Sequence, residues 1–289
     1  MEQRTLNKEA REAIANLLDD PSPAVRRGLL NHFQELAEVG RDFLREIANG
    51  PNRIAALHAR WYLMELKFAD PVSEFRGFIR SLGYELETGA FLLSRTVYPE
   101  LDISEFCGRL DQIAARCREL MAEPLLVRER CKIINRVLFH ELGFRGNIED
   151  YADPENSFVH RVLERRKGLP ITLSILYLLI ADRCGLQLEP VGVPGHFLVG
   201  CYHEGDVFFI DSFDHGRFLS AEDVIAYLEQ RKIPVEESYL APTTVREVLC
   251  RCCRNLASHF AAAKQPPLAR LFASFVEEFE TAYEQNTSS

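Results

Sequence analysis

Two residues of this chain, His196 and Asp211, have the side chains needed for acid–base chemistry. His196 lies in the run P-G-H-F-L-V-G and Asp211 in the run F-F-I-D-S-F-D-H-G, and both runs have the pattern of strands. An imidazole oriented by a carboxylate activates a nucleophile in many enzymes. Such a site also needs a thiol or hydroxyl, and a helix N-terminus is a position that stabilises a thiolate. A helix does precede the histidine, but it opens at G-L-P with Pro170 as its first residue.

The sequence patterns around these two residues predict an α+β fold. The apolar run from Ile171 to Ala181 predicts a buried helix, which Gly185 closes. Residues 190–202 and 206–212 predict two strands joined by the turn H-E-G-D. Helical patterns fill most of the chain before and after this core. Helices followed by a helix packed on a small antiparallel sheet define the α+β class.

The run N-S-F-V-H-R-V-L-E-R-R-K-G-L-P-I-T-L-S-I-L-Y, with P-G-H-F-L-V and I-D-S-F-D-H-G after it, resembles the bacterial transglutaminase-like family named after the Sir-B invasion-regulator locus. The upstream runs L-E-T-G-A-F-L-L and Y-P-E-L-D-I-S-E-F are similar to the helical N-terminal part of that family. The resemblance implies a papain-like or transglutaminase-like core with a cysteine at the N-terminus of the buried helix. Counted back from Gly185, the cysteine position falls on Pro170, whereas His196 and Asp211 match the histidine and the aspartate.

Pro170 therefore stands where the resemblance requires a nucleophile. Proline supplies no nucleophilic atom and no N–H, although it suits the first turn of a helix. Ser174 lies on the same helix face, one turn or about 6 Å deeper, and is the alternative nucleophile. The other interpretation of Ser174 is a hydroxyl bonded back to a helix carbonyl. Cys201, on the opposite side of its strand, and Cys184, at the far end of the helix, are poor substitutes.

A histidine–aspartate pair can also serve as a ligand site without any nucleophile. Beside a helix N-terminus, such a pair can bind an anion or a carboxylate. We therefore predict that His196, Gly195 in the turn before it, and Arg166 in the basic run R-R-K contact a small-molecule ligand. The alternatives are a core histidine bonded to Asp211 and a solvated helix end at residues 165–167.

The N-terminal part of the chain predicts helices with a short repeat. Pro21 and Pro51 each precede a helix, and apolar residues such as Leu29 and Ala59 recur at the same offset. This pattern indicates either HEAT-like hairpins or a plain helical bundle, and such stacks are typical docking surfaces for a protein partner. The predicted domains are a helical part over 1–84, a transglutaminase-like domain over 85–240 and a C-terminal helical extension over 241–289.

Composition narrows the functional classes. The net charge of -9 argues against a nucleic-acid or anionic-membrane binder. The first ten residues are too polar for a secretory signal, and the longest apolar run is far shorter than the roughly 20 residues that span a bilayer. The eight cysteines suggest buried thiols, and C-R-C-C at residues 250–253 lacks the partners of a metal site. We expect a cytoplasmic protein with neither metal nor cofactor.

Two functions remain in competition. The first is a non-catalytic transglutaminase-like protein that acts by binding or scaffolding, with a crevice at His196. The second is a hydrolase or acyltransferase in which Ser174 is the nucleophile and His196 and Asp211 activate it. The second requires that the Ser174 hydroxyl lie within hydrogen-bond reach of His196 and open to solvent.

Overall fold

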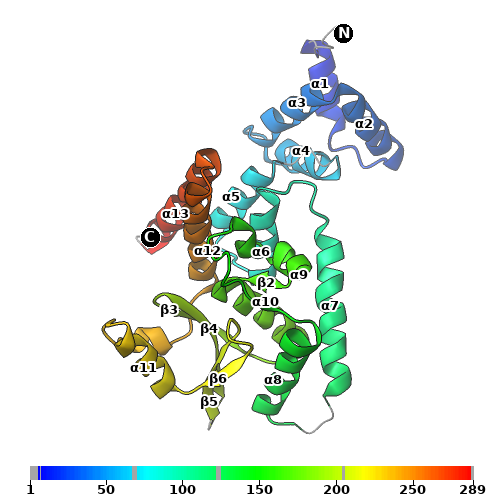
Figure 1. The fold of residues 1–289 in the computed structure, drawn as a ribbon. Coiled ribbons are helices and arrows are strands. Elements are labelled where there is room, and N and C mark those ends of the chain that lie inside the picture. Colours follow the sequence, from blue (N-terminus) through cyan, green and yellow to red (C-terminus); the bar gives the residue numbers. More distant parts are fainter. Residues whose placement is uncertain (1–5, 7, 67–69, 122–124, 204–205, 288–289) are drawn as a thin grey trace. The chain divides into compact units, whose positions relative to one another are not determined.

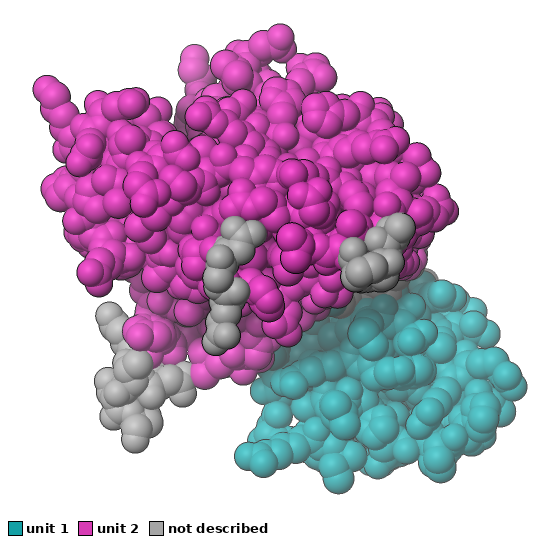
Figure 2. Space-filling model, turned by 90° about the horizontal axis from the view of Figure 1, so that it is seen from below, with its two compact units in different colours: residues 1–74 teal, residues 75–289 magenta. Residues whose placement is uncertain are grey.

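A computed structural model describes residues 6, 8–66, 70–121, 125–203 and 206–287 (Figure 1). The chain divides into two compact units, residues 1–74 and 75–289, which Figure 2 colours separately. The predicted H-E-G-D turn includes residues 204–205, which lie outside the described residues. The domain boundaries at 84/85 and 240/241 stay predictions.

The first unit is helical. Its helices are α1 (Lys8–Leu17), α2 (Pro23–Leu36), α3 (Glu38–Ala48) and α4 (Arg53–Glu65). Helices α1 and α3 begin at residues 8 and 38, and α2 and α4 begin at residues 23 and 53, so both pairs have the same thirty-residue offset. Leu29 of α2 and Ala59 of α4 are both buried, as are Phe33 and Leu63. Helices α2 and α4 thus bury corresponding positions, while their assignment to a HEAT-like repeat stays a prediction.

The second unit combines helices with two small sheets. Helix α5 (Pro71–Ser81) crosses the division, and the helices after it are α6 (Leu86–Arg95), α7 (Ile103–Leu120), α8 (Val127–Asn135), α9 (Val159–Arg165), α10 (Pro170–Arg183), α11 (Ala221–Gln230), α12 (Val245–Ala262) and α13 (Pro266–Thr287). Three short helical turns are η1 (Arg136–Glu141, π-helical), η2 (Pro154–Ser157) and η3 (Glu237–Leu240). The strands are β1 (Arg145–Gly146), β2 (Lys167–Gly168), β3 (Glu189–Val193), β4 (His196–His203), β5 (Asp206–Asp211) and β6 (Arg217–Leu219).

The α+β prediction is confirmed. Strands β3, β4, β5 and β6 form an antiparallel sheet in that order, and β1 pairs with β2 in parallel. The prediction of one strand over 190–202 is wrong, because β3 and β4 are separate strands in which Val193 pairs with His196. Pro194 has no N–H for a ladder and Gly195 has a φ of 73°, so the chain reverses there in a tight turn.

Helix α10 is the centre of the second unit (Figure 1). Its residues from Pro170 to Ala181 are all buried, because β4 packs on it from one direction and α7, α8 and α9 from others. A helix that is apolar on every side needs this kind of enclosure. The helix ends at Arg183, and Gly185 has a φ of 68°, which confirms the predicted glycine stop.

The hairpin of α12 and α13 packs onto the same unit. Helix α12 contacts α6, α10, η2 and β3. On α13, Phe275 and Phe279 meet Phe75 of α5 edge to face. The cysteines at 250, 252 and 253 are buried in this packing as free thiols. Across the described ranges, we find no helix with the length and apolar character needed to span a membrane.

Candidate functional site

His196 and Asp211 form a hydrogen-bonded pair at one end of the sheet. Antiparallel pairing brings the start of β4 near the end of β5, and His196 Nε2 lies 2.7 Å from Asp211 Oδ2. Both side chains are 14% exposed. Asp211 Oδ1 accepts the backbone N–H groups of Phe213 and Asp214, at 3.0 and 3.1 Å. This contact directs Nε2 at Asp211 and leaves Nδ1 of the ring for other groups.

Arg251 of α12 fixes the turn that carries the histidine. Its Nη2 donates to the carbonyls of Val193 and His196, at 3.0 and 2.8 Å, and its guanidinium lies over the ring of Phe197. Burial lowers the pKa of Arg251 from its usual value. Sequence reasoning missed this residue because its partners are carbonyl groups on a distant turn. A single charge inside an otherwise buried run, V-L-C-R-C-C, was the available signal.

Aromatic rings surround the pair. Phe213 meets the His196 ring edge-on at 6.3 Å between centroids, and Tyr227 lies 5.6 Å away. A Cβ at Gly146 would come within 2.5 Å of the Phe213 ring, so the ring lies directly against the backbone of β1. Tyr151 contacts the same ring from the loop after β1. Burial raises the pKa of Tyr227, which keeps its phenol neutral near pH 7.

Pro170 occupies the first position of α10, as the sequence predicts, and is buried. The Ser174 hydroxyl, one turn further on, lies 3.5 Å from the carbonyl of Phe197, the residue after His196. The N-terminal half of α10 therefore runs along the start of β4. Ser174 is 0% exposed, and the hydrogen bond found for its hydroxyl goes to a backbone carbonyl rather than to His196. This geometry lacks the solvent access that a nucleophilic Ser174 requires.

The residues predicted to contact a ligand lie in two different places. His196 and Asp211 border a cavity of about 260 Å³ between the sheet and α11, together with Tyr227, Arg217 and other residues of β3, β4, β6 and α11. Gly195 lies in the adjoining turn, where an added Cβ would be 3.5 Å from the Tyr227 hydroxyl. Arg166 borders a different cavity, of about 390 Å³, between α7 and η1. The structure therefore brings His196 together with Gly195 but not with Arg166.

A buried helix whose N-terminus meets a strand carrying histidine, with aspartate on the next strand, has the arrangement expected of a transglutaminase-like core. The family model described as the transglutaminase-like superfamily matches residues 104–254, slightly more than half of the chain. This chain therefore belongs to the transglutaminase-like superfamily.

Its relatives include proteins from bacteria and mammals. A UPF0162 protein of Xylella fastidiosa strain 9a5c is 34% identical over 182 residues, which cover 61% of this chain and 65% of the relative. The UPF0162 protein of Vibrio cholerae is 28% identical over 152 residues, 52% of this chain and 56% of the relative. F-box only protein 21 of Mus musculus is 38% identical over 133 residues, 43% of this chain but only 21% of that protein.

The chain spans less than two thirds of the length of the Xylella relatives. No solved structure matches the chain at a significant level.

Proposed function

We propose that this protein is a non-catalytic member of the superfamily that binds a small carboxylate at the His196–Asp211 pair. The observation that carries the proposal is Pro170 at the N-terminus of α10, beside an intact histidine–aspartate pair. Thiolate chemistry needs a sulfur atom at this position, and proline has none. The retained pair then has a binding role, because it is oriented, partly exposed and next to a cavity.

The lining of the cavity supports a ligand of this class. Arg217 and the phenol of Tyr227 can donate hydrogen bonds to a carboxylate, and His196, whose Nε2 is directed at Asp211, can donate a third from Nδ1 when its ring is protonated. Apolar side chains of Val193, Leu198 and Val224 line the same space and suit a short aliphatic or peptide-like group. The volume of about 260 Å³ limits the ligand to a small molecule or one side chain of a larger partner.

The binding role extends to a protein partner on the helical first unit. Ile54, Leu57 and Met64 of α4 are 62%, 65% and 58% exposed, and their spacing places them on one face of the helix. Exposed apolar residues on one helix face are typical of protein-binding surfaces. We also propose that the narrower family is the one named after the Sir-B locus and that the protein is cytoplasmic. Its eight free cysteines are consistent with a reducing compartment.

The ligand proposal is tested by NMR titration of the histidine ring resonances with acetate and with N-acetylglycine. The His196 ring resonances are expected to shift and saturate together with those of Tyr227, and the Tyr227 shifts should disappear in the His196→Ala variant. The matched control is His203→Ala, which removes an exposed histidine at the other end of the same strand. A titration that leaves the His196 resonances unmoved would sink the proposal.

The competing hydrolase or acyltransferase is tested on the same preparations. Wild-type protein incubated with glutamine-containing peptides, amines and activated esters is expected to show no turnover above buffer. Turnover that is lost in both Ser174→Ala and His196→Ala would establish the alternative, because only a serine activated by this histidine depends on both residues.

A further inference from the structure

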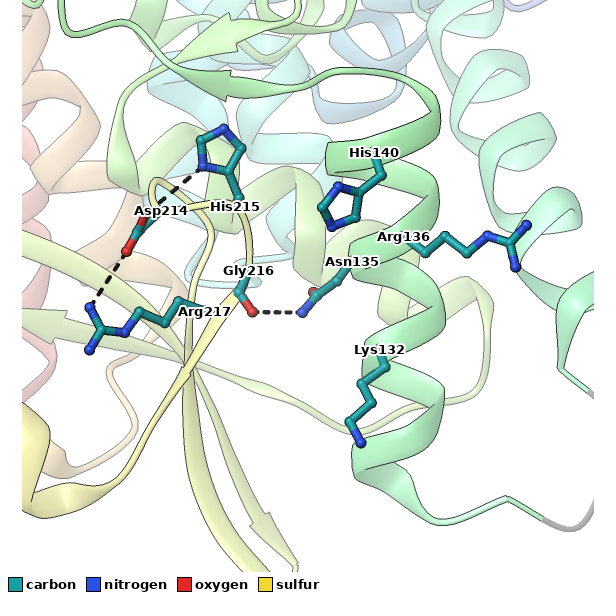
Figure 3. Close-up of a pocket in the computed structure, with 8 residues that line it drawn as sticks. All are labelled: Lys132, Asn135, Arg136, His140, Asp214, His215, Gly216 and Arg217. Atoms are coloured by element: carbon teal, nitrogen blue, oxygen red, sulfur yellow. Dashed lines mark hydrogen bonds and ion pairs between the residues drawn. The ribbon is translucent and has the colours of Figure 1, made fainter.

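A second, more open pocket lies on the other side of the segment that follows Asp211. Its walls are α8 with η1 and the turn that leads into β6, and its volume is about 660 Å³ (Figure 3). The lining residues are Lys132, Asn135, Arg136, His140, Asp214, His215, Gly216 and Arg217. The lining thus contains three permanent cations and two imidazoles but one carboxylate, in a chain whose net charge is -9.

The cations of this pocket are free to change partners. Lys132 pairs with Glu129, Arg136 with Glu141, and Arg217 with Asp214, and the cationic side chains are 56%, 58% and 63% exposed. Figure 3 shows the side chains of Arg136 and Arg217 extending in different directions from the pocket. Exposed ion pairs contribute only about 0–1 kcal/mol each, so these side chains can turn towards a bound anion at little cost.

The fixed part of the pocket is Asn135, which is 7% exposed. Its Nδ2 donates to the carbonyl of Gly216 at 2.6 Å, an interaction drawn in Figure 3. This bond fixes the orientation of the amide, because the reverse orientation would bring two oxygens together. Asn135 Oδ1 is buried and, within the described part of the chain, has no hydrogen-bond partner. A buried acceptor without a donor costs about 1–3 kcal/mol, so its presence at the pocket wall points to a ligand that donates.

The backbone of the pocket is also specialised. The π-helical turn η1 carries Arg136 and His140, and turns of this kind are frequent at functional sites. His215 has a φ of 52°, which is uncommon for a residue other than glycine. At Gly216 an added Cβ would lie 2.4 Å from the Asn135 amide, so only glycine permits this contact.

We propose that this pocket binds hydrogen phosphate, with Lys132, Arg136 and Arg217 around its oxygens and its P–OH donating to Asn135 Oδ1. Inorganic phosphate combines the two features that the pocket requires, because it is an oxyanion that keeps at least one P–OH near neutral pH. Sulfate has the same shape and charge but no proton to donate. A phosphate monoester loses its last P–OH above its second pKa, about 6. The site lies apart from the carboxylate site at His196, although Arg217 borders both.

The test is equilibrium dialysis of the full chain with radiolabelled inorganic phosphate at constant ionic strength and about pH 7.5, where a monoester is mainly the dianion. Unlabelled sulfate and methyl phosphate are the competitors. Sulfate and methyl phosphate are expected to compete at least about tenfold less well than unlabelled phosphate, a difference of about one hydrogen bond. Competition by all three ions with equal strength would overturn the assignment to Asn135, because the pocket would then recognise charge alone.

Variants of exposed residues complete the test without disturbing the buried amide. Arg136→Gln and Lys132→Gln are each expected to weaken phosphate binding by about three- to tenfold. The matched control is Arg116→Gln, because Arg116 pairs with the same Glu141 as Arg136 but borders the α7 cavity instead. Phosphate binding that is unchanged in Arg136→Gln, or weakened equally in Arg116→Gln, would overturn the proposal.

Discussion

The segment from Asp211 to Gly216 separates two regions that are built in opposite ways. On one side, His196 and Asp211 are 14% exposed and hold one another. On the other side, the cationic groups around Asn135 are more than half exposed and form solvent-exposed ion pairs. One region has its geometry fixed by backbone hydrogen bonds and packing, and the other has charge that can rearrange.

This difference has an energetic consequence. Changing a side chain in the fixed region leaves a buried donor or acceptor unpaired, or forces atoms together, at about 1–3 kcal/mol. Changing an exposed charge alters stability by less than about 0.5 kcal/mol in most proteins. Stability measurements should therefore distinguish the two regions, and binding measurements should detect the second.

The largest effect of a single substitution is expected where the two regions meet, at Gly216. Gly216 has a φ of 75°, and an added Cβ would lie 2.4 Å from the Asn135 amide. Gly216→Ala combines left-handed strain with overpacking and should lower the free energy of unfolding by about 3 kcal/mol, measured by urea denaturation.

Gly143→Ala is the matched control for that experiment. Gly143 has a φ of 74°, but nothing lies within 4 Å of an added Cβ. Gly143→Ala should therefore lower the free energy of unfolding by the backbone strain alone, about 1 kcal/mol. Equal losses in the two variants would mean that the contact between Gly216 and Asn135 does not constrain the fold.

Lowering the pH should destabilise the protein through a buried histidine that borders neither pocket. His160 is 3% exposed among Tyr98, Phe106 and Phe158, and burial lowers its pKa from 6.5 to about 4. The unfolded chain then binds the proton first as pH falls. The contribution of the neutral His160 to the free energy of unfolding is therefore fully present above pH 6.5. It is lost as the pH falls towards 4, by about 2–4 kcal/mol in total.

Urea denaturation between pH 7.5 and 4.5 measures this loss. His160→Phe should remove most of the pH dependence, and His259, whose pKa burial also lowers, should account for part of the remainder. A wild-type stability that stays flat between pH 6.5 and 5 would contradict a neutral, buried His160.

The sequence was sufficient for the parts of this molecule that repeat a simple pattern. The apolar run after Pro170 could only be a buried helix, and Gly185 marked its end. His196 and Asp211 could be paired because antiparallel pairing brings the start of one strand near the end of the next. The turn at Pro194 and Gly195 falls inside the single strand predicted over 190–202, although a Pro-Gly pair is a strong turn signal.

The second pocket could not be predicted in the same way. The change from α-helix to π-helix at Arg136 has no signature in residue periodicity. Asn135 and Gly216 are far apart in sequence, and their contact depends on how α8 packs beside the β5–β6 turn. Arg251 likewise donates to two carbonyl groups on a distant turn. The single charge in V-L-C-R-C-C marks the residue as unusual, but it does not indicate these partners.

The smallest effects should come from a matched pair of arginines, one in each region. Arg251 donates from a partly buried position to the carbonyls of Val193 and His196, whereas Arg217 is 63% exposed and lies 3.8 Å from Asp214. Arg251→Gln should lower the free energy of unfolding by about 1–3 kcal/mol and broaden the His196 ring resonances, because the turn loses its anchor. Arg217→Gln should change stability by less than about 0.5 kcal/mol while weakening phosphate binding. If both variants lowered stability equally, the exposed arginine would be part of the fixed framework, and the contrast between the two sides of the segment would fail.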